Sequence, residues 1–434
     1  MRIMVVGGGG REHAIIKYLA KSPKAEKIYC LPGNGGIAEL AECVNIKAED
    51  LDGLVKFAIN NQIDFAVVAP DDPLVLGAVD RLEDAGIKCF GPRADAAIIE
   101  GSKIFAKNLM RKYNIPTANF EVFNDLDNAL DYVKNSQAWP LVIKADGLAK
   151  GKGVVVAENL AQAEEALISS MRDKKFGSSG EKVLIEECLT GPEVSVLAFT
   201  DGKTLVPMVS SMDHKRAYDN NTGPNTGGMG VIAPNPHYDF NMAARCEREI
   251  FMPTINAMNK EGRKFKGCLY FGLMLTESGP KVIEYNCRFG DPETQAVLPL
   301  LNDECDLLEI MLAVSEERLS SVRVLFKWNC ASCCVVLASR EYPDSCKTGF
   351  EININKANIK DNINIFHAGT KLDNNNKLVT AGGRVLAVTA TAQSEGLSQE
   401  GIADALAKAR QDAYNAIKNI SFDGMRFRSD IGLH

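Results

Sequence analysis

The sequence lacks an excess of basic charge and holds few tryptophan and histidine residues. It carries 49 Lys and Arg against 56 Asp and Glu, a formal net charge of −7, with only 2 Trp and 5 His in 434 residues. Proteins that bind nucleic acid need a basic surface to neutralise phosphates, so this balance argues against a nucleic-acid partner. The five histidines are scattered along the chain, which disfavours a histidine-rich metal site.

Long apolar runs are also missing. No stretch approaches the roughly 18 apolar residues of a membrane-spanning helix, and charge follows the first apolar run too soon for a signal peptide. We therefore expect no membrane partner, a cytoplasmic location, and free thiols for the 12 cysteines. Cys330, Cys333 and Cys334 include a CxxC pair, but no second pair exists in the sequence. The apolar run around them predicts buried structural cysteines.

The chain is long enough for several domains, and its patterns predict an α/β protein. In residues 1–101 short β-branched runs alternate with helical stretches, which predicts a doubly wound parallel sheet with helices on its faces. Residues 102–325 hold more consecutive strands, an α+β pattern. Residues 326–434 mix strands with a C-terminal helix whose apolar face includes Ile402, Leu406 and Ala409.

Two glycine-rich turns follow neighbouring predicted strands near the N-terminus, GGGG at residues 7–10 and PGNGG at residues 32–36. The dinucleotide fingerprint GxGxxG fails because Glu12 stands at its last glycine and no acid ends the second strand, so a nicotinamide cofactor is not expected. Backbone amides at a helix start suit a phosphate group. A tight strand-to-helix turn would need the same glycines, but two such turns at one edge favour a small phosphorylated ligand.

The stretch VIKADGLAKGKGVVVAEN, residues 142–159, has lysines and glycines between two predicted strands. It is no Walker A loop, because only three residues separate Gly147 from Gly151 and Gly153 stands where a hydroxyl is required. A glycine-rich hairpin can instead fold over phosphates from above, with Lys144 on the leading strand. The alternative is a flexible surface hairpin.

The segment KVIEYNCRFGDPETQ places three polar residues on one face of a predicted strand, because alternate residues of a strand share a face. These are Glu284, Asn286 and Arg288. Glu and Asn oxygens suit magnesium, which takes its remaining ligands from phosphates and water, and Arg288 could grip a phosphate or carboxylate. The segment LIEECLTGPEVSV supplies Glu186, Glu187 and Glu193, which suit either a purine nucleoside site or an exposed acidic loop.

Taken together, the segments GGREHA, PGNGG, EGSK, VIKADGLAKGKGV, DHKRAYDNNTGPNTGGMG and EYNCRFGDPETQ resemble the glycinamide ribonucleotide synthetase family of ATP-grasp enzymes over essentially the whole chain. The resemblance implies an N-terminal domain at 1–101, an ATP-grasp domain at 102–325 with a mobile lid at about 117–190, and a small mixed α/β domain at 326–434. It implies that glycine is joined to 5-phosphoribosylamine through glycyl phosphate, with ATP converted to ADP and phosphate, in purine biosynthesis.

The resemblance also implies roles for matched positions. ATP would contact Lys103, Lys144, Gly151, Gly153, Glu186, Glu187, Leu189 and Glu193. Mg²⁺ or Mn²⁺ would bind Glu284 and Asn286. The catalytic positions would be Asp213, Lys215 and Arg288. The two substrates would meet Gly9, Gly10, Gly33, Asn34, Gly35, Asn225, Thr226, Gly227 and Gly228.

Two positions depart from the family pattern. Asp71 stands where we expect Glu, one methylene longer, and Lys150 replaces a small residue in the lid. Three other functions stay open from the sequence: another ATP-grasp carboxylate–amine ligase or carboxylase, a nucleotide-binding regulatory module without turnover, and a nicotinamide oxidoreductase. We expect small-molecule partners only, and a monomer or weak homodimer.

Overall fold

The structure is a computed structural model that describes residues 1–148 and 153–433. Its first segment forms the predicted parallel sheet, in the order β3-β2-β1-β4-β5. The strands are β1 (Arg2–Gly7), β2 (Lys27–Pro32), β3 (Glu42–Cys43), β4 (Phe65–Val68) and β5 (Lys88–Phe90). The helices are α1 (Gly10–Leu19), α2 (Leu51–Asn60), α3 (Asp71–Val75), α4 (Ala78–Asp84) and α5 (Ala94–Gly101).

Both faces of this sheet are buried, as the doubly wound prediction requires. Ile3 and Val5 enter the core that holds the apolar face of α1, whereas Met4 and Val6 enter the core that holds α2 and α4. The chain runs outward from β1 to β3 and then returns to β4 on the other side of β1. The carboxyl ends of β1 and β4 therefore flank a topological switch point, where α/β sheets commonly bind ligands.

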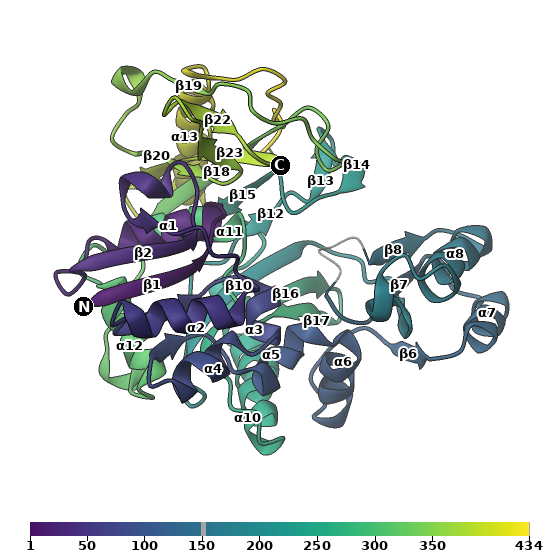
Figure 1. Ribbon diagram of the computed structural model, residues 1–434. Helices are drawn as coiled ribbons and strands as arrows, with labels where there is room; N and C mark the ends of the chain where they lie inside the picture. Colours follow the sequence, from purple (N-terminus) through teal and green to yellow (C-terminus); the bar gives the residue numbers. More distant parts are fainter. Residues whose placement is uncertain (149–152, 434) are drawn as a thin grey trace.

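A small unit with its own core follows α6 (Lys103–Lys112) and projects from the body at the right of Figure 1. Its antiparallel sheet has the order β6-β9-β7-β8. The elements are β6 (Phe120–Phe123), α7 (Leu126–Lys134), β7 (Leu141–Ala145), β8 (Val154–Ala157), α8 (Leu160–Leu167) and β9 (Val183–Glu187). β7 and β8 form the predicted hairpin, but Lys150 and Gly151 lie outside the described residues. The unit lies within the range that the sequence predicts as a lid.

A second antiparallel sheet forms the body next to this unit, in the order β11-β10-β16-β17. The strands are β10 (Glu193–Thr200), β11 (Leu205–Pro207), β16 (Gly267–Thr276) and β17 (Gly279–Asn286). Helices α9 (Phe240–Cys246) and α10 (Met252–Lys260) continue into each other through a π-helical turn at Glu247–Phe251 and bury Phe251 against Phe271 of β16. Helix α12 (Leu307–Ser315) completes the body.

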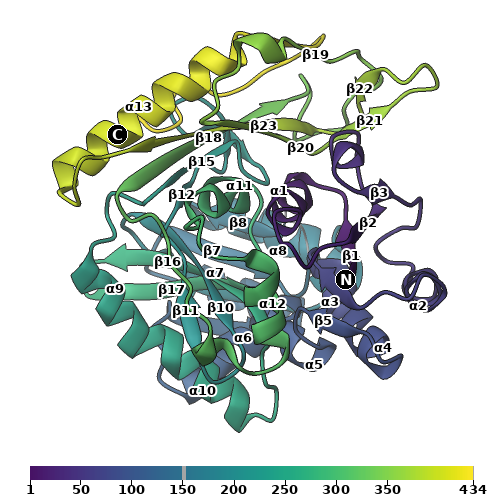
Figure 2. The same cartoon turned by 90° about the vertical axis from the view of Figure 1, so that its left-hand side faces the viewer.

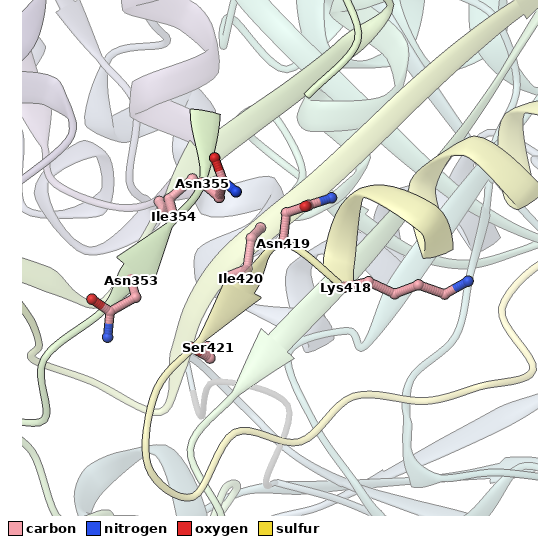
Figure 3. Close-up of a pocket in the computed structure, with 7 residues that line it drawn as sticks. All are labelled: Asn353, Ile354, Asn355, Lys418, Asn419, Ile420 and Ser421. Carbon is pink, nitrogen blue, oxygen red and sulfur yellow. The ribbon is translucent and has the colours of Figure 1, made fainter. Parts of the chain in front are cut away.

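The C-terminal sheet takes two strands from the middle of the chain. Its order is β12-β15-β18-β23-β20, formed by β12 (Met212–Asp213), β15 (Gly230–Ala233), β18 (Cys330–Ala338), β23 (Arg384–Gln393) and β20 (Ile363–His367). Helix α13 (Gln399–Ile417) lies along its outer face (Figure 2). Cys333 and Cys334 are fully buried in β18, as predicted, whereas Cys330 at the start of the strand is only partly buried, so the prediction of burial is wrong for Cys330.

Short elements connect these layers. Two-stranded ribbons are formed by β13 (Arg216–Tyr218) with β14 (Thr222–Asn225), β19 (Asn353–Ile354) with β24 (Ile420–Ser421), and β21 (Thr370–Leu372) with β22 (Leu378–Thr380). Helix α11 (Glu293–Val297) is buried between α1 and the C-terminal sheet (Figure 2). Across the described part of the chain, no helix is long and apolar enough to cross a membrane.

Candidate active site

The two glycine turns meet at the carboxyl edge of the N-terminal sheet. β1 and β2 are parallel with Gly7 opposite Pro32, and the Gly33 amide donates to the Gly7 carbonyl at 3.1 Å. A Cβ on Gly8 would lie 2.5 Å from the Gly33 carbonyl oxygen, so a side chain there would force the turns apart. The sequence prediction of two turns at one edge is confirmed.

The Asn34 side chain ties these turns to the C-terminal domain. Its Nδ2 donates to the carbonyls of Gly8 at 3.0 Å and His367 at 2.8 Å. Its Oδ1 accepts from the amides of Gly36 and Ile37. Because these bonds occupy the side-chain amide, a ligand would meet this loop mainly through backbone groups.

The polar start of α11 faces the first glycine turn. A Cβ on Gly10 would lie 2.5 Å from Gln295 Nε2, and one on Gly9 would lie 3.2 Å from Asp291 Oδ2. Gln295 Nε2 donates to Asp291 Oδ1 at 2.7 Å, while Gln295 Oε1 is buried with no hydrogen-bond partner among the described residues. Burial would raise the pKa of Asp291, but Arg384 and Arg11 lower it below its ordinary value.

Strand β17 carries the polar face that the sequence predicts. Glu284 lies opposite Gly272 and Asn286 opposite Tyr270 on β16, so the two side chains share one face. Arg288 follows directly, and its Nη2 donates to Asn286 Oδ1 at 3.1 Å. The alternate residues Tyr285 and Cys287 are buried on the other face. The structure therefore brings Glu284, Asn286 and Arg288 together.

Positive charge surrounds the Glu284 carboxylate. Burial alone would raise the pKa of Glu284, but the cations Lys215, Lys144, Lys103 and Arg288 lower it below its ordinary value. Its carboxylate makes no hydrogen bond or ion pair with any residue in the described ranges. An ionised carboxylate and an amide oxygen are hard donors that fit Mg²⁺ or Mn²⁺. No group of three or more His, Cys, Asp or Glu side chains in the described residues could hold a metal alone, so phosphate and water oxygens would complete the shell.

The sheet of the predicted lid, β6-β9-β7-β8, contacts β17 next to three buried charged side chains. Lys144 on β7 lies 3.0 Å from Glu186 Oε2 on β9, and its Nζ donates to the Ile283 carbonyl on β17 at 3.2 Å. Lys107 of α6 lies 3.0 Å from the same Glu186 oxygen, and burial lowers the pKa of Lys107 to about 8. The second oxygen, Glu186 Oε1, is buried without a partner in the described part of the chain. That oxygen can accept a hydrogen bond from a ligand.

The other predicted ATP positions lie on α6, between β7 and β8, on β9, in the linker to β10 and at the start of β10. Lys103 Nζ donates to the Gly147 carbonyl at 2.7 Å, and the Gly153 carbonyl accepts from the Ala145 amide at 2.8 Å. Glu187 accepts from the Asn119 amide at 2.9 Å and pairs with Lys281 at 3.1 Å, while Leu189 is half-buried in the linker to β10. The half-exposed Glu193 pairs with Lys215 at 2.9 Å.

Two carboxyl groups, those of the partly buried Asp213 and the buried Glu293, lie beside Lys215. Burial and the neighbouring Glu293 raise the pKa of Asp213 well above its ordinary value, and Asp213 Oδ1 has no hydrogen-bond partner in the described ranges. Glu293 Oε1 accepts from the Tyr270 hydroxyl at 3.2 Å. Two acidic groups beside the Glu284 cluster could receive an ammonium group.

The loop at residues 226–228 lies against Asp213 of this pair. Thr226 Oγ1 donates to the Lys215 carbonyl at 2.8 Å and accepts from the Gly228 amide at 3.0 Å. The Gly227 carbonyl accepts from Arg384, and Gly228 has a positive φ of 106° beside Asp213. Asn225, in contrast, is exposed at the end of β14.

Protein-family models match three consecutive segments of the chain. Models of phosphoribosylglycinamide synthetase match the N domain at residues 1–100, the ATP-grasp (A) domain at residues 101–294 and the C domain at residues 332–434. The chain belongs to the phosphoribosylglycinamide synthetase family.

Individual relatives support the family assignment over the full length. Phosphoribosylamine–glycine ligase of Caldanaerobacter subterraneus is 47% identical over 99% of both chains, and the enzyme of that name in Clostridium acetobutylicum is 44% identical over 100% of this chain and 99% of its own. The crystal structure of phosphoribosylamine–glycine ligase from Thermotoga maritima superposes with a TM-score of 0.83 at 31% identity, covering 99% of this chain and 100% of that one. Biotin carboxylase of Campylobacter jejuni shares the fold at 16% identity, with a TM-score of 0.73 over 100% of this chain and 94% of its own.

Because the chain contains the ATP-grasp domain of this family, family membership implies that it uses ATP and a divalent metal ion. Five residues at the site were not predicted from the sequence: Asp291, which precedes α11, Glu293 and Gln295 of α11, and Glu100 and Tyr270. The signal for α11 was present, because DPETQ is polar and directly precedes the apolar run AVLPLL. For Glu100 no local pattern distinguishes a buried carboxylate at the end of an ordinary helix.

Proposed function

We propose that the chain joins glycine to 5-phosphoribosylamine, giving glycinamide ribonucleotide, ADP and phosphate. The observation that carries this proposal is the meeting of β7 and β17, where the buried Lys144 touches the Ile283 carbonyl next to Glu284. This contact puts Lys144 beside the strand whose Glu284 and Asn286 oxygens would bind a metal ion. An ATP phosphate tail would bind near this contact, because lysines and a cation neutralise its charge.

The adenosine part of ATP belongs between β9 and the linker to β10. Glu186 Oε1, which is buried and unpartnered in the described residues, would accept from the adenine amino group. The backbone from Glu187 to Leu189 would hold the purine edge, and Glu193 would hold the ribose hydroxyls. Because Glu193 pairs with Lys215, ribose binding would share or replace that ion pair.

Lys103 and Lys144 would contact the phosphates, while Glu284 and Asn286 would hold Mg²⁺ or Mn²⁺. When bound, such a cation neutralises phosphate charge and orients the terminal phosphoryl group for transfer. The four cations around Glu284 would stabilise the negative charge that the triphosphate brings.

Glycine would lie between the cations and the carboxyl pair. Arg288 and Lys215 would orient its carboxylate, which attacks the terminal phosphorus atom of ATP, so that ADP leaves and glycyl phosphate forms. Asp213 and Glu293 would hold its ammonium group. No protein nucleophile is needed, because alignment and charge neutralisation suffice for this transfer.

The sugar phosphate of phosphoribosylamine would suit the glycine turns at residues 8–10 and 33–35, since α1 begins at Gly10 and the free amides at the start of a helix favour an anion; the Gly9 amide itself donates to Glu12. The amine nitrogen would then attack the glycyl carbonyl carbon. The amide bond forms, phosphate leaves, and the attacking nitrogen loses one proton. A closed lid keeps water from the acyl phosphate in the meantime.

An ADP-release assay with one substrate omitted at a time tests this function. Phosphoribosylamine is formed in the cuvette from ribose 5-phosphate and ammonia, and bicarbonate serves as the alternative acceptor. The proposal requires ADP release only when ATP, glycine and phosphoribosylamine are all present. Release that needs bicarbonate, or that persists without phosphoribosylamine, would instead indicate a carboxylase or a different ligase.

A further inference from the structure

A buried carboxylate from the N-terminal segment contacts the chain just after β17. Glu100 lies at the end of α5 in the N-terminal segment and is 8% exposed. Its Oε2 accepts from the Cys287 amide at 2.7 Å, and its Oε1 lies 2.9 Å from Arg288 Nη2. One carboxylate therefore holds both the backbone and the side chain that directly follow Asn286.

The same Arg288 nitrogen also contacts Asn286. Arg288 Nη2 donates to Asn286 Oδ1 at 3.1 Å, so that oxygen is turned toward the guanidinium. Asp71 Oδ2 is farther away, at 3.9 Å from this nitrogen. Arg288 Nε is buried and makes no hydrogen bond within the described ranges. Glu100 is thus the principal anionic partner that fixes the direction of the guanidinium.

We propose that Glu100 is a positioning residue that holds Arg288 in place and balances its charge beside the Glu284–Asn286 pair. This inference rests on the proposed function, because it takes these two residues as metal ligands. Without the Glu100 carboxylate, the oxygens left near the guanidinium are Asn286 Oδ1 at 3.1 Å, the Phe289 carbonyl at 3.4 Å and Asp71 Oδ2 at 3.9 Å, so its charge is less fully balanced beside the Glu284–Asn286 pair. A fixed positive charge there competes with a divalent cation. Residues that orient metal ligands typically change metal affinity or activity by roughly 10–100-fold when mutated.

The surrounding sequence supports this role. Glu100, Gly101, Ser102 and Lys103 form one short segment in which Glu100 contacts the end of β17 and Lys103 contacts the Gly147 carbonyl in the lid. Ser102 caps α6 and donates to Asp146 Oδ1 at 3.0 Å. The segment therefore connects the metal-bearing strand with the phosphate-covering hairpin. A packing role alone would not need a carboxylate with two specific donors.

The test measures Mn²⁺ binding in the presence of ADP by electron paramagnetic resonance, which requires no turnover. Wild type is compared with Glu100→Gln, Arg288→Met and the double variant. We expect Glu100→Gln to weaken Mn²⁺ binding roughly tenfold or more. In the double variant both charges are gone, so its Mn²⁺ affinity should return to within about threefold of the wild-type affinity. Its ligation activity should stay impaired.

The matched control is Asp201→Asn. Asp201 is also a buried carboxylate, 1% exposed, and it accepts from the Leu319 amide at 3.0 Å, but it lies in the turn after β10. It should leave Mn²⁺ binding unchanged. Thermal unfolding confirms that each variant is folded. If Glu100→Gln does not fold, the double variant and Arg288→Met carry the test, since both should bind Mn²⁺ with ADP nearly as wild type does.

Unchanged Mn²⁺ binding in Glu100→Gln would overturn the role of Glu100. If Glu100→Gln is folded, a double variant that binds Mn²⁺ no better than Glu100→Gln would do the same. If Glu100→Gln is unfolded, a double variant that binds Mn²⁺ far more weakly than wild type would do so. A failure of the metal site itself looks different. In that case wild type would bind no Mn²⁺ with ADP, or Glu284→Ala would bind it normally.

Discussion

The Lys144 ammonium lies 3.0 Å from the Glu186 carboxylate, and both side chains are buried between the lid and the body. Lys107 shares the same carboxylate oxygen, so two lysines compensate one glutamate. The three side chains tie the small unit to α6, and in the proposed function their excess positive charge would be balanced by a phosphate of ATP.

We expect Lys144→Ala to impair nucleotide handling more than folding. Lys107 continues to pair with Glu186, so the carboxylate is not left alone in the interior. A lost hydrogen bond to a charged group costs about 1.5–3 kcal/mol, which is about 10–100-fold in kcat/KM for ATP. Steady-state kinetics with varied ATP measure this change, and an unchanged KM and kcat for ATP would contradict the role of Lys144.

Glu284→Ala should abolish ligation while leaving the fold intact. The carboxylate makes no tie to another described residue, so its removal frees no buried partner. Loss of a metal ligand removes several kcal/mol of charge stabilisation, and we expect turnover to fall by about a thousandfold or more. Glu277→Ala, at the exposed turn between β16 and β17, is the control on the same hairpin. Turnover like that of wild type in Glu284→Ala would refute the metal role.

We expect the protein to lose stability at low pH because two histidines are buried at the interface between α1 and β20. His13 Nδ1 accepts from the His367 amide at 2.8 Å, and both rings are buried. Burial lowers the pKa of His13 to about 3 and that of His367 to about 4. Because the folded-state pKa values lie below the ordinary 6.5, unfolding takes up protons at lower pH. Stability is thus complete above about pH 6.5 and is lost as the pH falls toward 4 and 3.

Urea unfolding between pH 7 and 4.5 measures this effect. Each histidine contributes a slope of up to about 1.4 kcal/mol per pH unit in the free energy of unfolding. His13→Asn retains an acceptor for the His367 amide but cannot titrate, so it should flatten the slope. The exposed His237→Asn is the control and should leave the slope unchanged. An equal slope in wild type and His13→Asn would count against the buried neutral pair.

Gly228→Ala should disturb the loop over Asp213. Gly228 has a φ of 106°, which L-residues rarely adopt, and a Cβ there would lie 2.5 Å from Pro292 Cδ. Backbone strain of this kind costs about 1–3 kcal/mol, and displacement of the loop should raise the KM for glycine. A Cβ on Gly396 meets nothing within 4 Å, so Gly396→Ala is the control. Normal stability together with a normal KM in Gly228→Ala would show that the loop tolerates a side chain.

The sequence predicts those parts of the site that depend on local order. The alternation along β17 places Glu284 and Asn286 on one face whatever lies around the strand, and the glycine turns mark the ends of β1 and β2. Apolar spacing over residues 73–86 predicts one helix, but Gly77 takes a φ of 88° and separates α3 from α4. Because of that break Asp71 lies in a short helix, and the Asp71 side chain points toward Arg288.

Contacts between distant residues could not be predicted in the same way. Asn34 is fixed by the carbonyl of His367, 333 residues away, and Glu100 holds an amide 187 residues away. β12 and β15 join the C-terminal sheet although they lie in the middle of the sequence. The exact domain boundaries, the monomer or weak homodimer, and the cytoplasmic location stay predictions, as does the effect of Asp71 on the sugar.

A crystal structure of the protein with ADP and Mn²⁺, using the anomalous signal of manganese, shows whether Glu284 and Asn286 bind the metal ion. We expect an anomalous peak within about 2.5 Å of oxygens of both residues, with the diphosphate next to Lys103 and Lys144. A peak bound by other residues, or a diphosphate away from the β7–β17 contact, would contradict this expectation.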